Sequence, residues 1–388
     1  MTLTFDPAVG PGDFRDRRVT IVGLGKGRAS AGIARFLVAN GARVTISDPK
    51  GRDQLAEGIA RIGDTPVELV LAPRSDDAAL ADPDYVFFNQ GVRPRSSTIQ
   101  RAVQRGIPVL TEMGLFFRLC PAPIVGVTGT KGKSTTFTLI ARILEHGRRR
   151  VVAGGNIGTS IIDLLPTIVR DDLVLLELSS FQLETLGRSP HIAVVTNVLE
   201  DHIDHHGSRD AYVAAKRNIV AWQTSGDIAV LNLDDPGAAG LRAGAAAAIR
   251  GVSLERLPDR GAWVDAGDLM LVDGARSRRL CAASELRVPG RHNIANALAA
   301  AVVGEVQGIP DGTIAAELRA FGGLPHRLET VGRHDGVLWV NDSQGTTPYA
   351  TIPALAAYGR PPVVILGGVS KAADFSALGR AEIGRAHV

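Results

Sequence analysis

A glycine-rich run between an apolar segment and a helical segment restricts the fold of this chain more than any other feature. The run reads Gly126-Val-Thr-Gly-Thr-Lys-Gly-Lys-Ser-Thr135, and the residues that follow, up to 146, have the pattern of a helix. Glycines let backbone N–H groups approach phosphate oxygens, and a helix behind them adds its positive N-terminal end. We therefore predict an α/β unit whose loop binds the triphosphate of ATP.

The spacing within this loop departs from the common Gly-x4-Gly-Lys-Ser/Thr pattern. Gly126 lies one residue too early, and Gly129 falls inside the loop. The final Lys-Ser pair is present, so we expect Lys133 to reach the β- and γ-phosphates and the Ser134 hydroxyl to ligate Mg²⁺. The alternative is a glycine-rich turn without a ligand, and the strand and helix that flank the loop argue against it.

The bulk composition excludes several other classes of protein. A net charge of +3 over 388 residues does not favour nucleic-acid binding, and no apolar stretch is long enough to span a membrane. The first residues lack the pattern of a signal peptide, and the two cysteines, Cys120 and Cys281, fit a reducing compartment. We expect a cytoplasmic, monomeric protein that acts on small molecules.

Lysine is scarce in this chain, because six of its 43 basic residues are lysines. Arginine cannot replace a compact ammonium or a nucleophilic amine, so each lysine here is a candidate for function. Lys216 lies on an expected helix, and this argument applies to it. Chance placement with a solvated side chain is the alternative.

The N-terminal part has the pattern of a strand–helix–strand unit. Its elements are a strand over 18–22, the turn Gly23-Leu-Gly25, a helix over 29–40 and a strand over 42–48. Asp48 ends the second strand, as an acidic residue does in dinucleotide-binding folds. Arg28 occupies the place of the third glycine, so the pattern supports NAD chemistry only weakly.

The same order of elements recurs along the rest of the chain. Strands are expected over 173–177, 192–197, 337–341 and 363–366, a helix over 351–358, and a helix or surface loop over 236–251. Strands that alternate with helices predict parallel sheets. We therefore predict an α/β protein with a Rossmann-like domain over 1–110, a central P-loop ATPase domain with a mainly parallel sheet over 111–323, and a partial Rossmann-like domain over 324–388.

Polar residues follow two of the central strands. Glu177 ends one strand beside the phosphate loop and suits Mg²⁺, although a helix cap or an ion pair is the alternative. In the run 197–206, His202, His205 and His206 invite a zinc interpretation, but the sequence shows no remote ligand to complete it. Solvation on a surface loop explains His205 and His206 equally well, so His202 is the better site candidate.

These motifs together resemble the Mur ligase family over nearly the whole chain, from about Val19 to Phe375. Besides the phosphate loop, the matching segments in family order are Asn156-Ile-Gly158, Glu177-Leu-Ser-Ser-Phe-Gln-Leu-Glu184, Glu200-Asp-His-Ile-Asp204, Gly290-Arg-His-Asn-Ile-Ala-Asn296, Leu324-Pro-His-Arg327 and Asn341-Asp-Ser343. The resemblance implies an ATP-dependent, ADP-forming ligase of peptidoglycan synthesis. It would join glutamate, by default D-glutamate, to UDP-N-acetylmuramoyl-L-alanine.

The resemblance also implies roles for individual residues. The triphosphate would be bound by Gly129, Thr130, Lys131, Gly132, Lys133, Ser134 and Thr135, and the rest of the nucleotide by Asn293, Asn296, Arg327 and Asp342. One Mg²⁺ would be held by Ser134 and Glu177, and a second by His202 and a carbamylated Lys216. The acceptor would contact Asn156, His202 and, through its uracil, Asp48, and the glutamate would contact Thr346 and Lys371. The catalytic residues would be Lys133, His202 and Lys216.

In the implied reaction the alanyl carboxylate attacks the γ-phosphorus of ATP, and the amine of glutamate then expels phosphate from the acyl phosphate. Alternatives within the superfamily are a ligase that adds L-glutamate to the same acceptor and a folylpolyglutamate-type ligase. Alternatives from other classes are a non-catalytic nucleotide-binding module and a P-loop kinase.

The chain departs from the family pattern at three places. Ser343-Gln-Gly-Thr-Thr-Pro348 replaces the usual Ser-Lys-Ala-Thr-Asn, and Asn89-Gln-Gly91 replaces Ser-Pro-Gly. Both differences leave the enantiomer of glutamate open. The short segment after Leu324 and the unusual run 383–388 lead to the hypothesis of a fragment with a non-native end.

Overall fold

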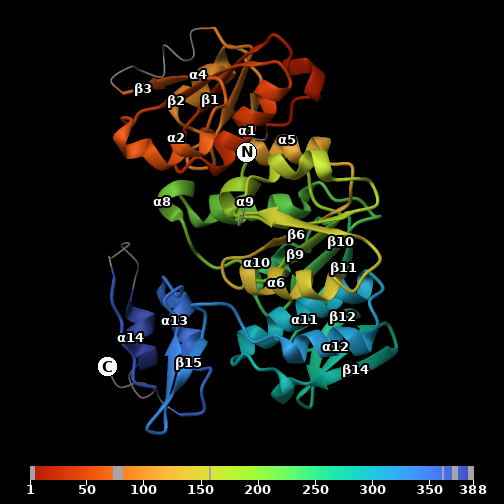
Figure 1. The fold of residues 1–388 in the computed structure, drawn as a ribbon. Helices are drawn as coiled ribbons and strands as arrows, with labels where there is room; N and C mark the ends of the chain where they lie inside the picture. Colours follow the sequence, from red (N-terminus) through yellow and green to blue (C-terminus); the bar gives the residue numbers. More distant parts are fainter. Residues whose placement is uncertain (1–4, 73–81, 157–158, 361, 369–374, 383–388) are drawn as a thin grey trace.

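Two sheets built mainly of parallel strands and one antiparallel hairpin organise the chain (Figure 1). The computed structural model describes residues 5–72, 82–156, 159–360, 362–368 and 375–382. Among these residues no helix combines the length and apolarity needed to cross a bilayer. The predicted α/β class with mainly parallel sheets is confirmed.

The N-terminal sheet has five parallel strands in the order β3-β2-β1-β4-β5. The strands are β1 (Arg18–Val22), β2 (Arg43–Asp48), β3 (Val67–Leu71), β4 (Tyr85–Phe88) and β5 (Val109–Leu110), and the helices are α1 (Arg28–Ala39), α2 (Ala56–Ile62) and α4 (Ser97–Gln104). The strand order reverses between β1 and β4. Sheets of this kind bind ligands outside the carboxyl ends of their strands at such a point, so the fold places a binding crevice there.

The central sheet has nine strands in the order β14-β13-β12-β11-β10-β9-β6-β8-β7. The strands are β6 (Ile124–Thr128), β7 (Val151–Gly155), β8 (Leu173–Glu177), β9 (Ile192–Val195), β10 (Ile228–Asn232), β11 (Ala248–Ser253), β12 (Arg260–Asp265), β13 (Asp268–Asp273) and β14 (Arg276–Ala282). The strands from β7 to β12 are parallel, and β13 and β14 are antiparallel to their neighbours. The phosphate loop lies between β6 and α6 (Lys133–Leu144), where the sequence predicted it.

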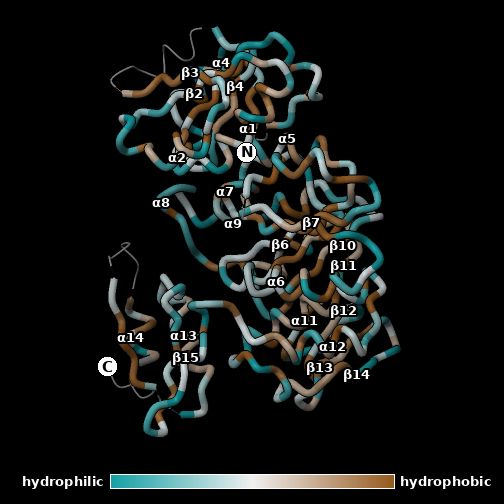
Figure 2. Tube along the Cα trace, in the orientation of Figure 1, coloured by the Kyte–Doolittle hydropathy of each residue, from teal (hydrophilic) through white to brown (hydrophobic). Residues whose placement is uncertain are grey.

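Helices cover both faces of the central sheet. One face packs on α6, α11 (Arg291–Val306) and α12 (Asp311–Ala320), and the other on α9 (Arg209–Ala221). Alternate residues of β6 belong to the two cores, because Val125 packs with the first set and Ile124 with the second. Figure 2 shows the hydrophobic residues gathered along the strands between these helices. Burial on both faces explains why these strands are continuous apolar runs.

The core on the α9 face of the central sheet continues into the N-terminal sheet. Phe116 of α5 (Glu112–Leu119) and Ile161 of the 3-10 helix Ile161–Thr167 share it with Ile21 and Ile46 of the N-terminal strands. An ion pair of 2.6 Å between Arg35 and Asp163 spans the same boundary. Apolar packing therefore joins the two sheets.

The C-terminal residues differ from the predicted strand–helix–strand unit. Strand β16 (Val337–Asn341) has the predicted bounds, but it pairs antiparallel with β15 (Glu329–His334), which was not predicted. Helix α13 (Pro348–Leu355) begins three residues before the predicted helix, and α14 (Ser376–Glu382) follows. The prediction of a strand over 363–366 was wrong, because these residues belong to no named strand and Ile365 is 89% exposed.

The prediction for residues 236–251 was also partly wrong. They contain the short helix α10 (Pro236–Gly240) and the first residues of β11. Their alanine and glycine content hides this strand, because its buried positions lie mostly beyond the glycine, at Val252 and Ser253.

Candidate active site

The loop between β6 and α6 requires glycine at two positions. Gly132 has a φ of +84°, and a Cβ there would lie 2.5 Å from Asn296 Oδ1. A Cβ on Gly129 would lie 1.9 Å from the hydroxyl oxygen of Thr196. Glycine at both positions lets the chain turn tightly into α6, whose N-terminal amides suit a phosphate group.

The residues after β9 support the loop from behind. The N–H of Thr130 donates to the Asn197 carbonyl (3.0 Å), and the N–H of Lys131 donates to Asn197 Oδ1 (2.8 Å). The Thr196 hydroxyl donates to the Lys131 carbonyl (2.6 Å). The Thr130 hydroxyl lies 2.8 Å from the hydroxyl of Tyr212. Sequence reasoning assigned no role to Asn197 or Tyr212, because these pairings join segments far apart in the chain.

Lys133 folds back over the loop that it follows. Its Nζ donates to the carbonyls of Gly129 (2.7 Å) and Thr130 (3.1 Å). Burial lowers the pKa of Lys133 to about 8, and the nearby Glu177 carboxylate opposes part of this effect. The ammonium group therefore lies at the phosphate loop. A bound phosphate could accept the hydrogen bonds that Nζ now donates to the two carbonyls.

Glu177 at the end of β8 is a buried carboxylate with one free oxygen. Its Oε1 accepts from Asn156 Nδ2 (3.0 Å), while Oε2 is buried and has no hydrogen-bond partner among the residues that the structure describes. A buried anionic oxygen without a partner is costly, and a hard divalent cation satisfies it. The residues therefore fit Mg²⁺, and the alternative of an ion-paired or helix-capping Glu177 is not what the structure shows.

A cavity of about 120 Å³ lies beside the loop and brings several predicted site residues together. Its lining comprises Gly129, Thr130, Lys133, Asn156, Ser179, Ser180, Phe181, Asp201, His202, Tyr212 and Lys216. The lining thus includes all three predicted catalytic residues and the predicted acceptor contact Asn156.

Lys216 is the unusual member of this cavity, because its side chain is 1% exposed. Its Nζ donates to the Thr128 hydroxyl (3.2 Å) and lies 5.1 Å from the centre of the Tyr212 ring. Within the described residues no carboxylate forms a salt bridge with it. Burial lowers the pKa of Lys216 well below its usual value, and the charge of Lys133 adds to this effect. Burial therefore favours the neutral, nucleophilic form of this amine.

His202 faces the same cavity from a strained backbone. Its φ is +52°, it precedes α8 (Ile203–His206), and its ring centre lies 4.8 Å from that of Phe181. Burial lowers the pKa of His202, which favours the neutral imidazole that binds metals. Asp201 beside it pairs with Lys131 at 3.3 Å and so links this segment to the phosphate loop.

The predicted nucleotide contacts come from α11 and from the C-terminal part of the chain. Asn296 on α11 accepts from the Thr136 hydroxyl (3.1 Å) and donates to Asn293 (3.3 Å), directly behind Gly132. The charge of Arg327 contributes to the lowered pKa of Lys133, so Arg327 approaches from the C-terminal part. Asp342 accepts from the N–H of Leu328 (3.0 Å), and burial raises its pKa. Asn293 and Asn296 therefore lie directly beside the loop.

Three predicted substrate residues lie elsewhere. Asp48 is buried in the N-terminal sheet and accepts backbone N–H groups of Leu24 (2.8 Å), Gly25 (3.2 Å) and Lys50 (3.0 Å). Thr346 is exposed, and Lys371 lies outside the described residues. Asp48 is thus a clamp on the glycine turn after β1, whatever it contributes to a substrate.

Replacing Asp48 by alanine is expected to lower the free energy of unfolding by about 1–3 kcal/mol, because the buried N–H of Leu24 loses its acceptor. Urea unfolding measures the effect. Asp64→Ala, at an exposed position of the same part of the chain, is the control and is expected to change the free energy by less than about 0.5 kcal/mol. Equal stability of Asp48→Ala and the parent protein would show that Asp48 is no clamp.

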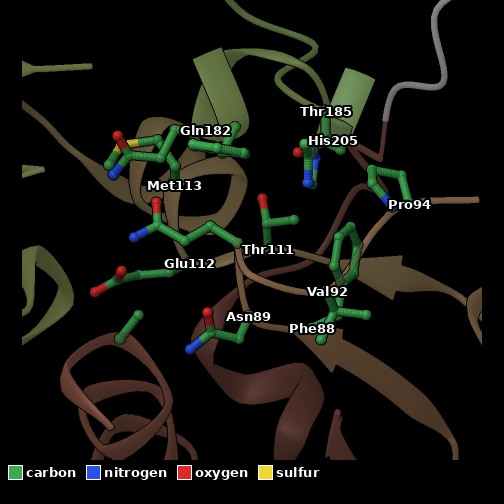
Figure 3. Close-up of a pocket in the computed structure, with 13 residues that line it drawn as sticks. Phe88, Asn89, Val92, Pro94, Thr111, Glu112, Met113, Gln182, Thr185 and His205 are labelled. Carbon is green, nitrogen blue, oxygen red and sulfur yellow. The ribbon is translucent and has the colours of Figure 1, made fainter. Parts of the chain in front are cut away.

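A second pocket lies between the N-terminal and central parts (Figure 3). The residues labelled there come from both, and they are Phe88, Asn89, Val92, Pro94, Thr111, Glu112, Met113, Gln182, Thr185 and His205. Asn89 Nδ2 donates to the Ser30 hydroxyl (3.0 Å), which in turn donates to the Gly23 carbonyl (2.7 Å) at the crevice of the first sheet. Burial raises the pKa of Glu112, which accepts from the Ser160 hydroxyl. No sequence motif marked Glu112.

The fold and the site define a class of protein: an α/β enzyme with a P-loop for ATP, a buried carboxylate that suits Mg²⁺ and a buried lysine whose pKa is lowered. Comparison with models of protein families shows which family within this class the chain matches. Residues 17–111 match the Mur ligase MurD-like, N-terminal domain, and residues 127–304 match the Mur ligase middle domain. The chain belongs to the Mur ligase family, whose members are ATP-dependent, ADP-forming amide ligases that use Mg²⁺.

Curated relatives cover most of the chain. A UDP-N-acetylmuramoylalanine--D-glutamate ligase of Pelotomaculum thermopropionicum is 39% identical over 372 residues, which are 95% of this chain and 80% of the relative. A protein of the same name from Symbiobacterium thermophilum is 40% identical over 363 residues, 92% of this chain and 78% of the relative. The predicted family is therefore confirmed.

Solved structures share the fold. MurF from Acinetobacter baumannii matches with a TM-score of 0.59 and 15% identity over 99% of this chain and 84% of that chain. The UDP-N-acetylmuramate-alanine ligase MurC from Thermotoga maritima matches with a TM-score of 0.53 and 20% identity over 89% of this chain and 80% of that chain. Both support the three-domain α/β architecture.

Proposed function

We propose that this chain adds glutamate, D-glutamate by default, to UDP-N-acetylmuramoyl-L-alanine in peptidoglycan precursor synthesis, with conversion of ATP to ADP and phosphate. The main support is the meeting of Lys133, His202 and Lys216 in one cavity beside the ATP loop. Both relatives described above are named as ligases that join D-glutamate to UDP-N-acetylmuramoylalanine. We further propose that the reaction takes place in the cytoplasm and that the monomer is the active form.

We assign the roles of the residues from the resemblance to the family, supported by the cavity beside the loop. Residues Gly129–Thr135 bind the triphosphate, Asn293, Asn296, Arg327 and Asp342 bind the rest of the nucleotide, and Asn156 and His202 bind the muramoyl-alanine. Ser134 and Glu177 hold one Mg²⁺, and His202 and carbamylated Lys216 hold a second. When bound, Mg²⁺ neutralises charge on the transferring phosphoryl group. By the resemblance to the family, Asp48 would contact the uracil, and Thr346 and Lys371 would contact the glutamate.

Carbamylation explains why a lysine is buried where no carboxylate pairs with it. The neutral amine of Lys216 adds CO₂ and releases one proton, so an ammonium position becomes an anionic oxygen ligand. Arginine cannot undergo this reaction at neutral pH. The Thr128 hydroxyl, 3.2 Å from Nζ, orients the group.

The chain's own residues then promote two steps. Asn156 and His202 hold the alanyl carboxylate toward the γ-phosphorus, and Lys133 stabilises the charge that develops as ADP leaves. The amine of glutamate attacks the carbonyl of the resulting acyl phosphate, loses a proton and expels phosphate. The domains of residues 1–110, 111–323 and 324–388 close around the cavity and exclude water from this intermediate.

Phosphate release tests the proposal. With ATP, Mg²⁺ and UDP-N-acetylmuramoyl-L-alanine, D-glutamate is expected to support release at least about 100-fold faster than L-glutamate, because an enantiomer misplaces its buried polar groups. Omission of the acceptor is the control and is expected to abolish release. Turnover with L-glutamate alone would refute the stereochemical part, and glutamate-independent release would refute the ligase.

A further inference from the structure

Three side chains outside the ATP cavity converge on one point. Glu184 Oε2 lies 3.1 Å from His205 Nε2 and 3.5 Å from His206 Nδ1, and the three ligand atoms lie within 4.8 Å of one another. Glu184 directly follows α7 (Ser180–Leu183), and the two histidines end α8. The sequence lacked the remote ligand that a zinc interpretation required, and the fold supplies it as Glu184.

His206 shows that this cluster is more than a set of surface groups. Its side chain is fully buried, so the predicted alternative of solvation was wrong for this residue. Its Nε2 lies 3.0 Å from the Ser180 hydroxyl, while Nδ1 is buried, has no hydrogen-bond partner in the described part of the chain, and lies 3.5 Å from Glu184 Oε2. In the tautomer whose Nε2 donates to Ser180, Nδ1 presents its lone pair to the Glu184 carboxylate, and a cation between them stabilises this arrangement.

We propose that Glu184, His205 and His206 bind a divalent transition-metal ion of the Zn²⁺ type. In a tetrahedral zinc site with bonds of about 2.0–2.2 Å, neighbouring ligand atoms lie about 3.3–3.6 Å apart, close to the distances found here. Two imidazoles select a transition metal over Mg²⁺, which prefers oxygen ligands. The fourth position remains for water, because His205 also lines the pocket of Figure 3.

The metal joins two elements that are too short to be stable alone. α7 and α8 have four residues each. Phe181 on α7 contacts the rings of His205 (4.5 Å between centres) and His206 (5.6 Å), and it also packs on His202 in the ATP cavity. The site thus positions Phe181 and His202 and takes no part in bond making, so it goes beyond the proposed ligase activity.

Zinc binding to chelator-treated, full-length protein tests this inference. In excess Mg²⁺, titration with ZnCl₂ is expected to show one tight site per chain and a rise in the thermal unfolding midpoint. Glu184→Gln and His205→Gln are each expected to weaken the affinity at least about 100-fold, since even outer partners of metal ligands contribute about 10–100-fold. With Co²⁺ as the probe, the visible bands of a four-coordinate ion are expected and are lost in both variants.

Two controls separate this site from others. His334→Gln removes a histidine whose side chain is 82% exposed, and Glu177→Gln removes the ligand beside the ATP loop. Both variants are expected to keep the zinc site. Three outcomes would each overturn the inference. They are loss of zinc binding in Glu177→Gln, retention of zinc binding in both Glu184→Gln and His205→Gln, and no stoichiometric zinc uptake by the parent protein. Circular dichroism of the variants confirms that a loss does not come from unfolding.

Discussion

Replacement of Lys216 by alanine is expected to slow glutamate-dependent phosphate release by about 10²–10³-fold, the typical effect of removing one group that stabilises the transition state. The side chain is 1% exposed and forms no salt bridge within the described residues. A buried ammonium without a partner is costly, so burial selects the neutral amine that can add CO₂. The measurement is the steady-state rate with saturating ATP, acceptor and D-glutamate.

Lys216→Arg distinguishes a carbamate from a plain cation. Arginine keeps a positive charge but cannot form a carbamate, so this variant is expected to be as inactive as Lys216→Ala. Added formate or acetate is expected to restore part of the activity of Lys216→Ala, because a small carboxylate fits the space left by the carbamate. A Lys216→Arg variant that retains activity would show that charge alone suffices.

The strands that the sequence predicted best are those with the simplest local pattern. The apolar runs over 18–22, 173–177 and 337–341 have these bounds in the structure. Each contains several β-branched or leucine residues and ends at a glycine or a polar group. Local composition therefore determines where such a strand lies. It does not determine the partner, and β16 shows this, because its antiparallel neighbour β15 is a mostly polar run with one glycine, which no strand pattern marks.

The candidate site likewise has features that the sequence predicts and features that only the tertiary fold reveals. The phosphate loop and Glu177 could be predicted because each is a short motif at a strand end. The hydrogen bond between the buried Lys216 and Thr128 could not, since it depends on how α9 packs against the central sheet. The pairing of Glu184 with His205 joins residues 21 positions apart. Contacts of this kind are formed by the tertiary fold, and a spacing rule within one helix or strand cannot reveal them.

The scarcity of lysine is explained in part by the structure. Lys133 and Lys216 are buried beside the ATP loop, and both have a lowered pKa, which an arginine would not provide. Lys131 pairs with Asp201 at the mouth of the same cavity. Lys26 and Lys50 are exposed, so scarcity alone did not identify function. Position in the fold distinguishes the lysines beside the ATP loop from the exposed lysines of the N-terminal part.

Lys133→Met is expected to lower kcat by about 10²–10³-fold and to remove a pH dependence of ATP binding. In the ligand-free protein the pKa of Lys133 is about 8. Phosphate favours the charged amine, so ATP binding above pH 8 requires proton uptake, and the affinity falls by up to about tenfold per pH unit. Below pH 8 the amine is already charged, and the slope vanishes. Calorimetric titration with a non-hydrolysable ATP analogue and Mg²⁺ between pH 7 and pH 9.5 measures it.

Lys131→Met is the matched control for this experiment. Lys131 lies two residues earlier in the same loop but pairs with Asp201, whereas Lys133 donates to the loop carbonyls of Gly129 and Thr130. Its replacement is expected to weaken binding at every pH and to leave the slope above pH 8 unchanged. A slope that persists in Lys133→Met would assign the proton to another group. A slope that disappears only there would identify Lys133 as the residue whose buried amine is charged by the arriving phosphate.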